Sequence, residues 1–132
     1  MGIFDKIFKN ENEPKKEDKK QIAWIDIKHI EMLDEIVEAS KHQPVAILKH
    51  STSCGISRMV LRQFESSYDL NDEDMKLYFL DLLNHRDISN KIASRFNVPH
   101  ESPQLIVLKD GRVIYDASHS EISTEKLKSI SA

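Results

Sequence analysis

One apolar run limits the fold of this 132-residue chain more than any other feature. Residues 44–50 have the sequence Pro-Val-Ala-Ile-Leu-Lys-His, which predicts a buried β-strand. The polar residues 51–53 then predict a turn, and an amphipathic helix is expected to begin at Cys54. The pattern therefore places the single cysteine of the chain between the end of a strand and the first turn of a helix.

The other elements alternate between strand and helix. Strands are expected at residues 22–27, 44–49, 75–82, 104–109 and 112–117, and helices at residues 30–40, 54–68, 86–96 and 124–130. The initial strand–helix–strand order predicts parallel strands, whereas the turn Asp110-Gly111 predicts an antiparallel pair at the end. We therefore predict an α/β fold with a central mixed β-sheet, flanked by helices on both faces.

Apolar spacing also predicts which side chains the first two helices bury. The inward residues are expected to be Ile30, Leu33, Ile36 and Val37 in the first helix, and Ile56, Met59, Val60 and Phe64 in the second. Ser123 or Thr124 is expected to cap the last helix.

Residues 1–20 differ in composition from the rest of the chain. Positions 11–20 are almost entirely charged, which predicts a flexible N-terminal extension ahead of a single domain at residues 21–132. The extension also carries an apolar stripe with helical spacing, formed by Ile3, Phe4, Ile7 and Phe8. Two interpretations stay open: a segment that contacts a membrane or partner, and a tail that is mobile or docks on its own domain.

Composition excludes several classes of protein. The formal net charge of −3 argues against binding to nucleic acid, and no apolar stretch is long enough to be an integral membrane segment. One cysteine cannot form an internal disulfide, and no secretory signal is visible, so a cytoplasmic monomer is expected. None of the six histidines has a metal-ligand spacing, so we expect surface histidines and no metal site.

Cys54 is the strongest candidate for chemistry. Unpaired N–H groups and the positive end of the helix dipole favour the thiolate at a helix start, and the thiolate is the reactive form. Ser57 stands three residues on, where a dithiol oxidoreductase carries its second cysteine. One-cysteine chemistry is therefore expected, with the resolving thiol supplied by another molecule. The alternative is an inert buried cysteine.

Two sets of residues could support a thiolate at this position. The hydroxyl groups of Thr52, Ser53 and Ser57 and the backbone at Gly55 are candidates for supporting roles. Positive charge would come from Lys49, His50, Arg58 and His100, which are candidates for binding an anionic substrate. The alternatives are solvated surface side chains for the charged residues and a helix surface hydroxyl for Ser57.

A proline lies immediately before the fourth predicted strand, in Glu101-Ser102-Pro103-Gln104. Proline fits the first residue of a strand because it donates no ladder hydrogen bond. A cis bond between Ser102 and Pro103 would be a deliberate feature, because about 5–6% of such bonds are cis.

The order of elements, the Cys-x-x-Ser sequence and the X-Pro strand start resemble the thioredoxin superfamily. More narrowly, Lys49-His50-Ser51-Thr52-Ser53-Cys54 and His100-Glu101-Ser102-Pro103-Gln104 resemble the monothiol bacilliredoxins, over residues 22–130. The resemblance implies a thioredoxin-like fold in which Ser102 and Pro103 lie beside Cys54 and bind substrate. It also implies that Cys54 removes bacillithiol from S-bacillithiolated client proteins, with bacillithiol or another redoxin as resolving thiol. Gly55 is a departure, because the family commonly has proline there.

Two other functions stay open. Cys54-Gly55-Ile56-Ser57 is similar to the Cys-Gly-Phe-Ser sequence of monothiol glutaredoxins, which hold an iron–sulfur cluster across a dimer. Their other motifs are missing: Glu101-Ser102-Pro103 replaces Thr-Val-Pro, and no Gly-Gly-x-Asp follows the hairpin. The other possibility is a non-catalytic thioredoxin-like binding module in which Cys54 is a redox sensor.

Overall fold

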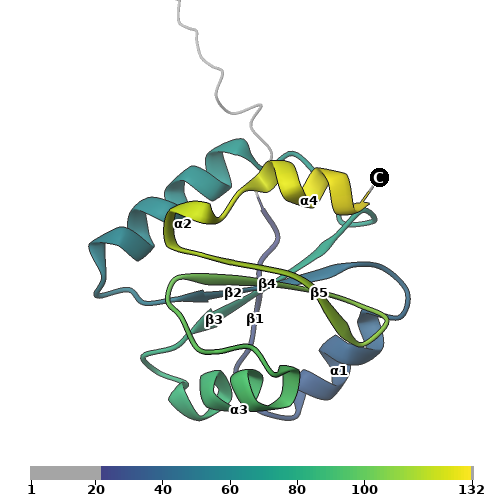
Figure 1. Cartoon of the computed structure of the whole chain (residues 1–132), viewed down its shortest axis with the longest axis horizontal. Coiled ribbons are helices and arrows are strands. Elements are labelled where there is room, and N and C mark those ends of the chain that lie inside the picture. Colours follow the sequence, from purple (N-terminus) through teal and green to yellow (C-terminus); the bar gives the residue numbers. More distant parts are fainter. Residues whose placement is uncertain (1–21, 132) are drawn as a thin grey trace, which may run out of the picture.

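The computed structural model describes residues 22–131, and the apolar stripe at residues 3–8 lies outside them. The elements are β1 (Ile25–Asp26), α1 (Met32–Ala39), β2 (Val45–His50), α2 (Gly55–Ser67), β3 (Lys76–Asp81), α3 (Arg86–Phe96), β4 (Gln104–Lys109), β5 (Arg112–Ser118), the 3₁₀ turn η1 (His119–Glu121) and α4 (Thr124–Ser131). The strands form one sheet in the order β1-β3-β2-β4-β5. Figure 1 shows α2 and α4 on one face of this sheet and α1 and α3 on the other.

The predicted α/β class and mixed sheet are confirmed. The first three strands are mutually parallel, β4 runs antiparallel to β2, and β5 runs antiparallel to β4. The central strand β2 therefore has a parallel neighbour on one side and an antiparallel neighbour on the other. In this register Lys49 lies opposite Gln104 of β4, and His50 lies opposite Asp81 of β3.

The side chains of β2 alternate between two apolar clusters. Val45 and Ile47 belong to the cluster that includes side chains of α1 and α3, and Ala46 and Leu48 belong to the cluster beneath α2 and α4. Alternation then directs Lys49 toward α1 and α3 and places His50 on the α2 side, where its ring lies against Phe79. All six residues of β2 are buried, so a strand with two polar residues at its end is enclosed throughout.

The predicted hairpin between β4 and β5 is present. Asp110 and Gly111 both have positive φ, at 53° and 78°, as a two-residue hairpin turn requires. The turn is attached to the end of α1, because the Ser40 carbonyl accepts the Asp110 N–H at 2.7 Å and the Ser40 hydroxyl accepts the Gly111 N–H at 2.8 Å.

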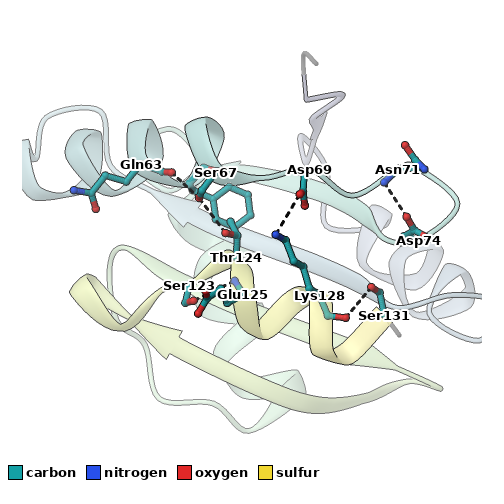
Figure 2. Close-up of polar contacts among 11 residues, drawn as sticks. Gln63, Ser67, Asp69, Asn71, Asp74, Ser123, Thr124, Glu125, Lys128 and Ser131 are labelled. Carbon is teal, nitrogen blue, oxygen red and sulfur yellow. Dashed lines mark hydrogen bonds and ion pairs between the residues drawn. The ribbon is translucent and has the colours of Figure 1, made fainter. Parts of the chain in front are cut away.

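Side-chain contacts join α2 to α4 (Figure 2). The Thr124 hydroxyl donates to Ser67 Oγ at 3.0 Å, and the Ser67 hydroxyl donates to the Gln63 carbonyl at 2.9 Å. Ser123 caps α4 as expected, since its Oγ accepts the Glu125 N–H at 3.2 Å. Thr124 therefore connects the two helices, and Ser123 accepts a hydrogen bond from a backbone N–H in the first turn of α4.

Three details of the predicted elements were wrong. Ile56 and Met59 do not point inward: they are 53% and 47% exposed, because Ser57, Val60 and Phe64 form the buried face of α2. Ile30 is also exposed, because α1 begins only at Met32. The first strand is limited to two residues rather than 22–27, because its ladder with β3 comprises Ile25 and Asp26 and ends with one bond from the Ile27 N–H to the Phe79 carbonyl.

Candidate active site

Cys54 occupies the N-cap position of α2 and is half-buried. Its backbone is extended, with φ −104° and ψ 123°, and its carbonyl accepts the Arg58 N–H at 3.1 Å as the first bond of the helix. The Cys54 N–H donates to the Ser51 carbonyl at 3.2 Å, which closes the turn after β2. The thiol is therefore held at the start of a 13-residue helix, partly open to solvent rather than enclosed in the core.

The turn before Cys54 is supported from below by Ser57. This side chain is fully buried, and its Oγ accepts the Ser51 N–H at 3.1 Å. The surface-hydroxyl alternative for Ser57 is therefore wrong, and its hydroxyl fixes the turn that carries the thiol. Arg58 adds a second contact on the outside of the turn, where Nη1 donates to the Thr52 carbonyl at 2.9 Å. Thr52 and Ser53 are themselves exposed.

The peptide bond between Ser102 and Pro103 is cis. Lys49 pairs with Gln104 as the last pair between β2 and β4. The cis-proline segment therefore enters β4 at the end of the sheet where β2 leads into the turn before Cys54. The Pro103 carbonyl is already paired with the His119 N–H at 3.0 Å, and the Ser102 hydroxyl is buried without a hydrogen-bond partner within residues 22–131.

Lys49 is fully buried, so the solvated alternative for this residue is wrong. Its Nζ lies 3.1 Å from Nδ1 of His100, and Ser89 Oγ of α3 lies 3.3 Å from the same nitrogen. Burial lowers the pKa of Lys49 from 10.5 to about 8. The pKa of His100 is also lowered, first by burial and next by the positive charge of Lys49. His100 as a whole residue is exposed, as is Arg58.

His50 also departs from expectation, since it is only 3% exposed rather than a surface histidine. Its ring lies 5.3 Å from that of Phe79, and its Nδ1 has no hydrogen-bond partner in the described part of the chain. Burial lowers the pKa of His50, and the carboxylate of Asp81 opposes that change. A neutral imidazole is therefore favoured at this position four residues before the thiol.

Several residues near this site were missed by sequence reasoning. Three buried polar residues lie in or contact the turn before Cys54 or the loop at residues 99–103: Ser51, Ser89 and Gln104. The Gln104 side chain donates to the Pro99 carbonyl at 2.9 Å. Gln104 gave the one usable signal, because it is a polar residue at the start of an otherwise apolar strand. Ile56 and Met59 form exposed apolar surface within five residues of Cys54.

Residues 22–131 contain no group of three or more His, Cys, Asp or Glu side chains placed to hold a metal ion. Within the same residues, no helix is both long and apolar enough to cross a bilayer.

A single half-buried cysteine at a helix N-cap, together with a cis-proline immediately before β4 in a sheet of this order, defines a thioredoxin-fold thiol–disulfide oxidoreductase. The chain belongs to the monothiol bacilliredoxin family, since the family model described as "Monothiol bacilliredoxin BrxC" matches residues 25–127. The predicted family is thereby confirmed.

Solved structures agree with this assignment. A candidate oxidoreductase with a thioredoxin fold is 31% identical, with a TM-score of 0.70 over 83% of this chain and 94% of that one. The thioredoxin of Malassezia sympodialis is 18% identical, with a TM-score of 0.66 over 86% and 95% of the two chains. The thioredoxin of Trypanosoma brucei brucei is 17% identical, with a TM-score of 0.62 over 84% and 93%. The last two similarities concern the fold alone.

Proline at position 55 should be tolerated and should stabilise the domain. A Cβ at Gly55 would meet only the Arg58 guanidinium, at 3.8 Å, and the extended backbone of Cys54 suits a residue that precedes proline. Proline is favoured at the first helical position, and it lowers the entropy of the unfolded chain. We expect Gly55→Pro to raise the free energy of unfolding by about 0.4–1 kcal/mol in urea denaturation.

The matched variant Gly55→Ala should have an intermediate stability, because alanine restricts the unfolded backbone less than proline does. A Gly55→Pro protein less stable than the wild type would mean that this turn needs a glycine.

Proposed function

We propose that the protein removes bacillithiol from S-bacillithiolated protein cysteines. The observation that carries this proposal is the half-buried Cys54 at the start of α2, the sole thiol in a chain of the monothiol bacilliredoxin family. The Ser102-Pro103 segment enters β4 at the end of the sheet where β2 leads toward Cys54, and we propose that the backbone of Ser102 pairs there with an extended client segment as a short added strand.

The reaction consists of two successive thiol–disulfide exchanges, with no net oxidation or reduction. The Cys54 thiolate attacks the bacillithiol sulfur of the client disulfide, a new bond forms between Cys54 and bacillithiol, and the client sulfur leaves as a thiolate that takes a proton from water. A second thiolate then attacks the bacillithiol sulfur on Cys54, and Cys54 is released as a thiolate. Ser57 cannot perform this second step, so free bacillithiol or another redoxin supplies the resolving thiol.

The charges around the site suit an anionic thiol. Arg58 is exposed and donates to the Thr52 carbonyl in the turn before Cys54. The buried amine of Lys49 contacts Nδ1 of His100. We propose that the protein acts as a monomer in a reducing cytoplasm, where a single unpaired thiol persists.

Intact-mass spectrometry tests the proposal directly. Incubation with a model protein that carries one S-bacillithiolated cysteine should add one bacillithiol to the protein at Cys54, in step with release of the free client thiol. Added bacillithiol should then return Cys54 to the thiol and yield bacillithiol disulfide. A mixed disulfide that forms but is never released would favour the redox-sensor alternative, and failure to form one would contradict the proposal.

The iron–sulfur alternative needs two chains and two external thiols to complete four ligands, because each chain offers one cysteine. Anaerobic incubation with iron, sulfide and a low-molecular-weight thiol should leave the protein colourless and monomeric. A stable brown dimer would favour the cluster carrier instead.

A further inference from the structure

Lys49 is a buried cation that makes no ion pair with a carboxylate among residues 22–131. Its side chain is fully buried, and within residues 22–131 the hydrogen-bond partner of its Nζ is Nδ1 of His100. Burying an ammonium without an acid partner reduces stability. A residue that costs stability in this way is a candidate for a functional role.

The chemistry of the contact fixes the state of the His100 ring. An ammonium group only donates hydrogen bonds, so Nδ1 must be the acceptor, and the neutral ring then carries its hydrogen on Nε2. The Ser89 hydroxyl at 3.3 Å faces the same nitrogen and is also able to donate. The charged groups that act on His100 are Lys49, Glu101 and Arg86. Burial and the two cations favour the neutral ring, and only Glu101 opposes them.

Two paired strand residues, Lys49 of β2 and Gln104 of β4, hold the loop that carries Ser102 and Pro103. Lys49 contacts His100, and Gln104, its partner across β2 and β4, donates to the Pro99 carbonyl at 2.9 Å. His100 is itself exposed, although its Nδ1 faces a buried amine. Nε2 is therefore the nitrogen left for a ligand, three positions before the cis-proline.

We propose that Lys49 is a positioning residue that holds His100 with its hydrogen on Nε2, and that this N–H binds a carboxylate of the thiol carried on the substrate disulfide. The inference rests on the proposed function, because it assigns a residue that recognises the anionic part of the low-molecular-weight thiol. A neutral donor backed by a buried cation is suited to a carboxylate, because the cation adds to the attraction without being exposed to water.

Nitrogen NMR of histidine-labelled full-length protein tests the positioning role without any substrate. At pH 7.5 the wild type should show Nδ1 of His100 as an unprotonated nitrogen and Nε2 as a protonated one. In Lys49→Met the ring should become a mixture of tautomers, and its pKa should rise toward the ordinary value of about 6.5 because a nearby cation is lost. The control Ser89→Ala should keep the wild-type tautomer. A wild-type ring protonated on Nδ1, or no change in Lys49→Met, would overturn the inference.

Kinetics with two mixed disulfides of one model peptide tests recognition. One disulfide carries mercaptosuccinate, with two carboxylates, and the other carries the neutral thiol mercaptoethanol. The ratio of kcat/KM for the anionic over the neutral probe should fall about fivefold to tenfold in both Lys49→Met and His100→Gln. An unchanged ratio in His100→Gln would overturn the assignment of His100 to the carboxylate.

These outcomes are separable from failure of the proposed function. If the wild type reacts with neither probe, the thiol–disulfide reaction itself is contradicted. If it reacts equally with both while the tautomer is as stated, the reaction stands and the recognition role of His100 is wrong.

Discussion

Replacing Cys54 by serine should abolish thiol–disulfide exchange while leaving the domain folded. The chain has one cysteine, and a serine hydroxyl is not ionised near neutral pH without a base beside it, so no attacking group remains. We expect turnover of a mixed-disulfide substrate to fall by at least about a thousandfold. Mass spectrometry of the released client thiol over time measures this loss. Turnover close to that of the wild type would contradict both the reaction and the role of Cys54.

The Cys54→Ser variant should keep the fold, and its free energy of unfolding should equal or slightly exceed that of the wild type. Serine is among the preferred N-cap residues, and position 54 is the N-cap of α2. Cys54→Ala is the matched control, because it also lacks the thiol but cannot cap the helix. Both variants should be inactive, and Cys54→Ser should exceed Cys54→Ala in free energy of unfolding by about 1 kcal/mol. Loss of activity through unfolding would instead appear as a collapse of stability in both variants.

Short-range sequence patterns predicted much of the fold and the position of the thiol. The apolar run of β2, the turn before Cys54 and the Asp110-Gly111 hairpin are short-range signals, and each is present in the structure. The proline before β4 was also visible, and the bond before it is cis. These features are predictable because the residues that determine them are neighbours in the chain.

Burial near the ends of elements was not predictable in the same way. Lys49 and His50 end a buried strand, and a polar residue there could face either solvent or a helix that packs above it. The contact between Lys49 and His100 joins positions 51 residues apart, and nothing local indicates it. Met59 has helical spacing from Ile56, but both side chains are exposed, because the buried face of α2 is set by Ser57, Val60 and Phe64.

Replacing Lys49 by methionine should stabilise the domain near neutral pH, although it removes a contact seen in the structure. The pKa of Lys49 is lowered from 10.5 to about 8, which corresponds to about 3 kcal/mol lost by burying the ammonium. Methionine fills a similar volume without charge, and loss of the bond to His100 offsets about 1 kcal/mol of the gain. We expect a net gain of about 2 kcal/mol in the free energy of unfolding, measured in urea at pH 7.

The pH dependence gives this prediction its sharpest test. Below pH 8 the lysine is protonated in the folded and unfolded states, so the wild type bears the whole cost of the buried charge. Between pH 8 and 10.5 the folded protein loses this proton before the unfolded chain does, so wild-type stability rises relative to the variant. The advantage of Lys49→Met should therefore shrink steadily across this window and be lost near its upper end. The exposed Lys76→Met variant, as a control, should differ from the wild type by less than about 0.5 kcal/mol. A Lys49→Met protein less stable at pH 7, or an advantage that does not change with pH, would show that the buried amine is not held as a destabilising cation.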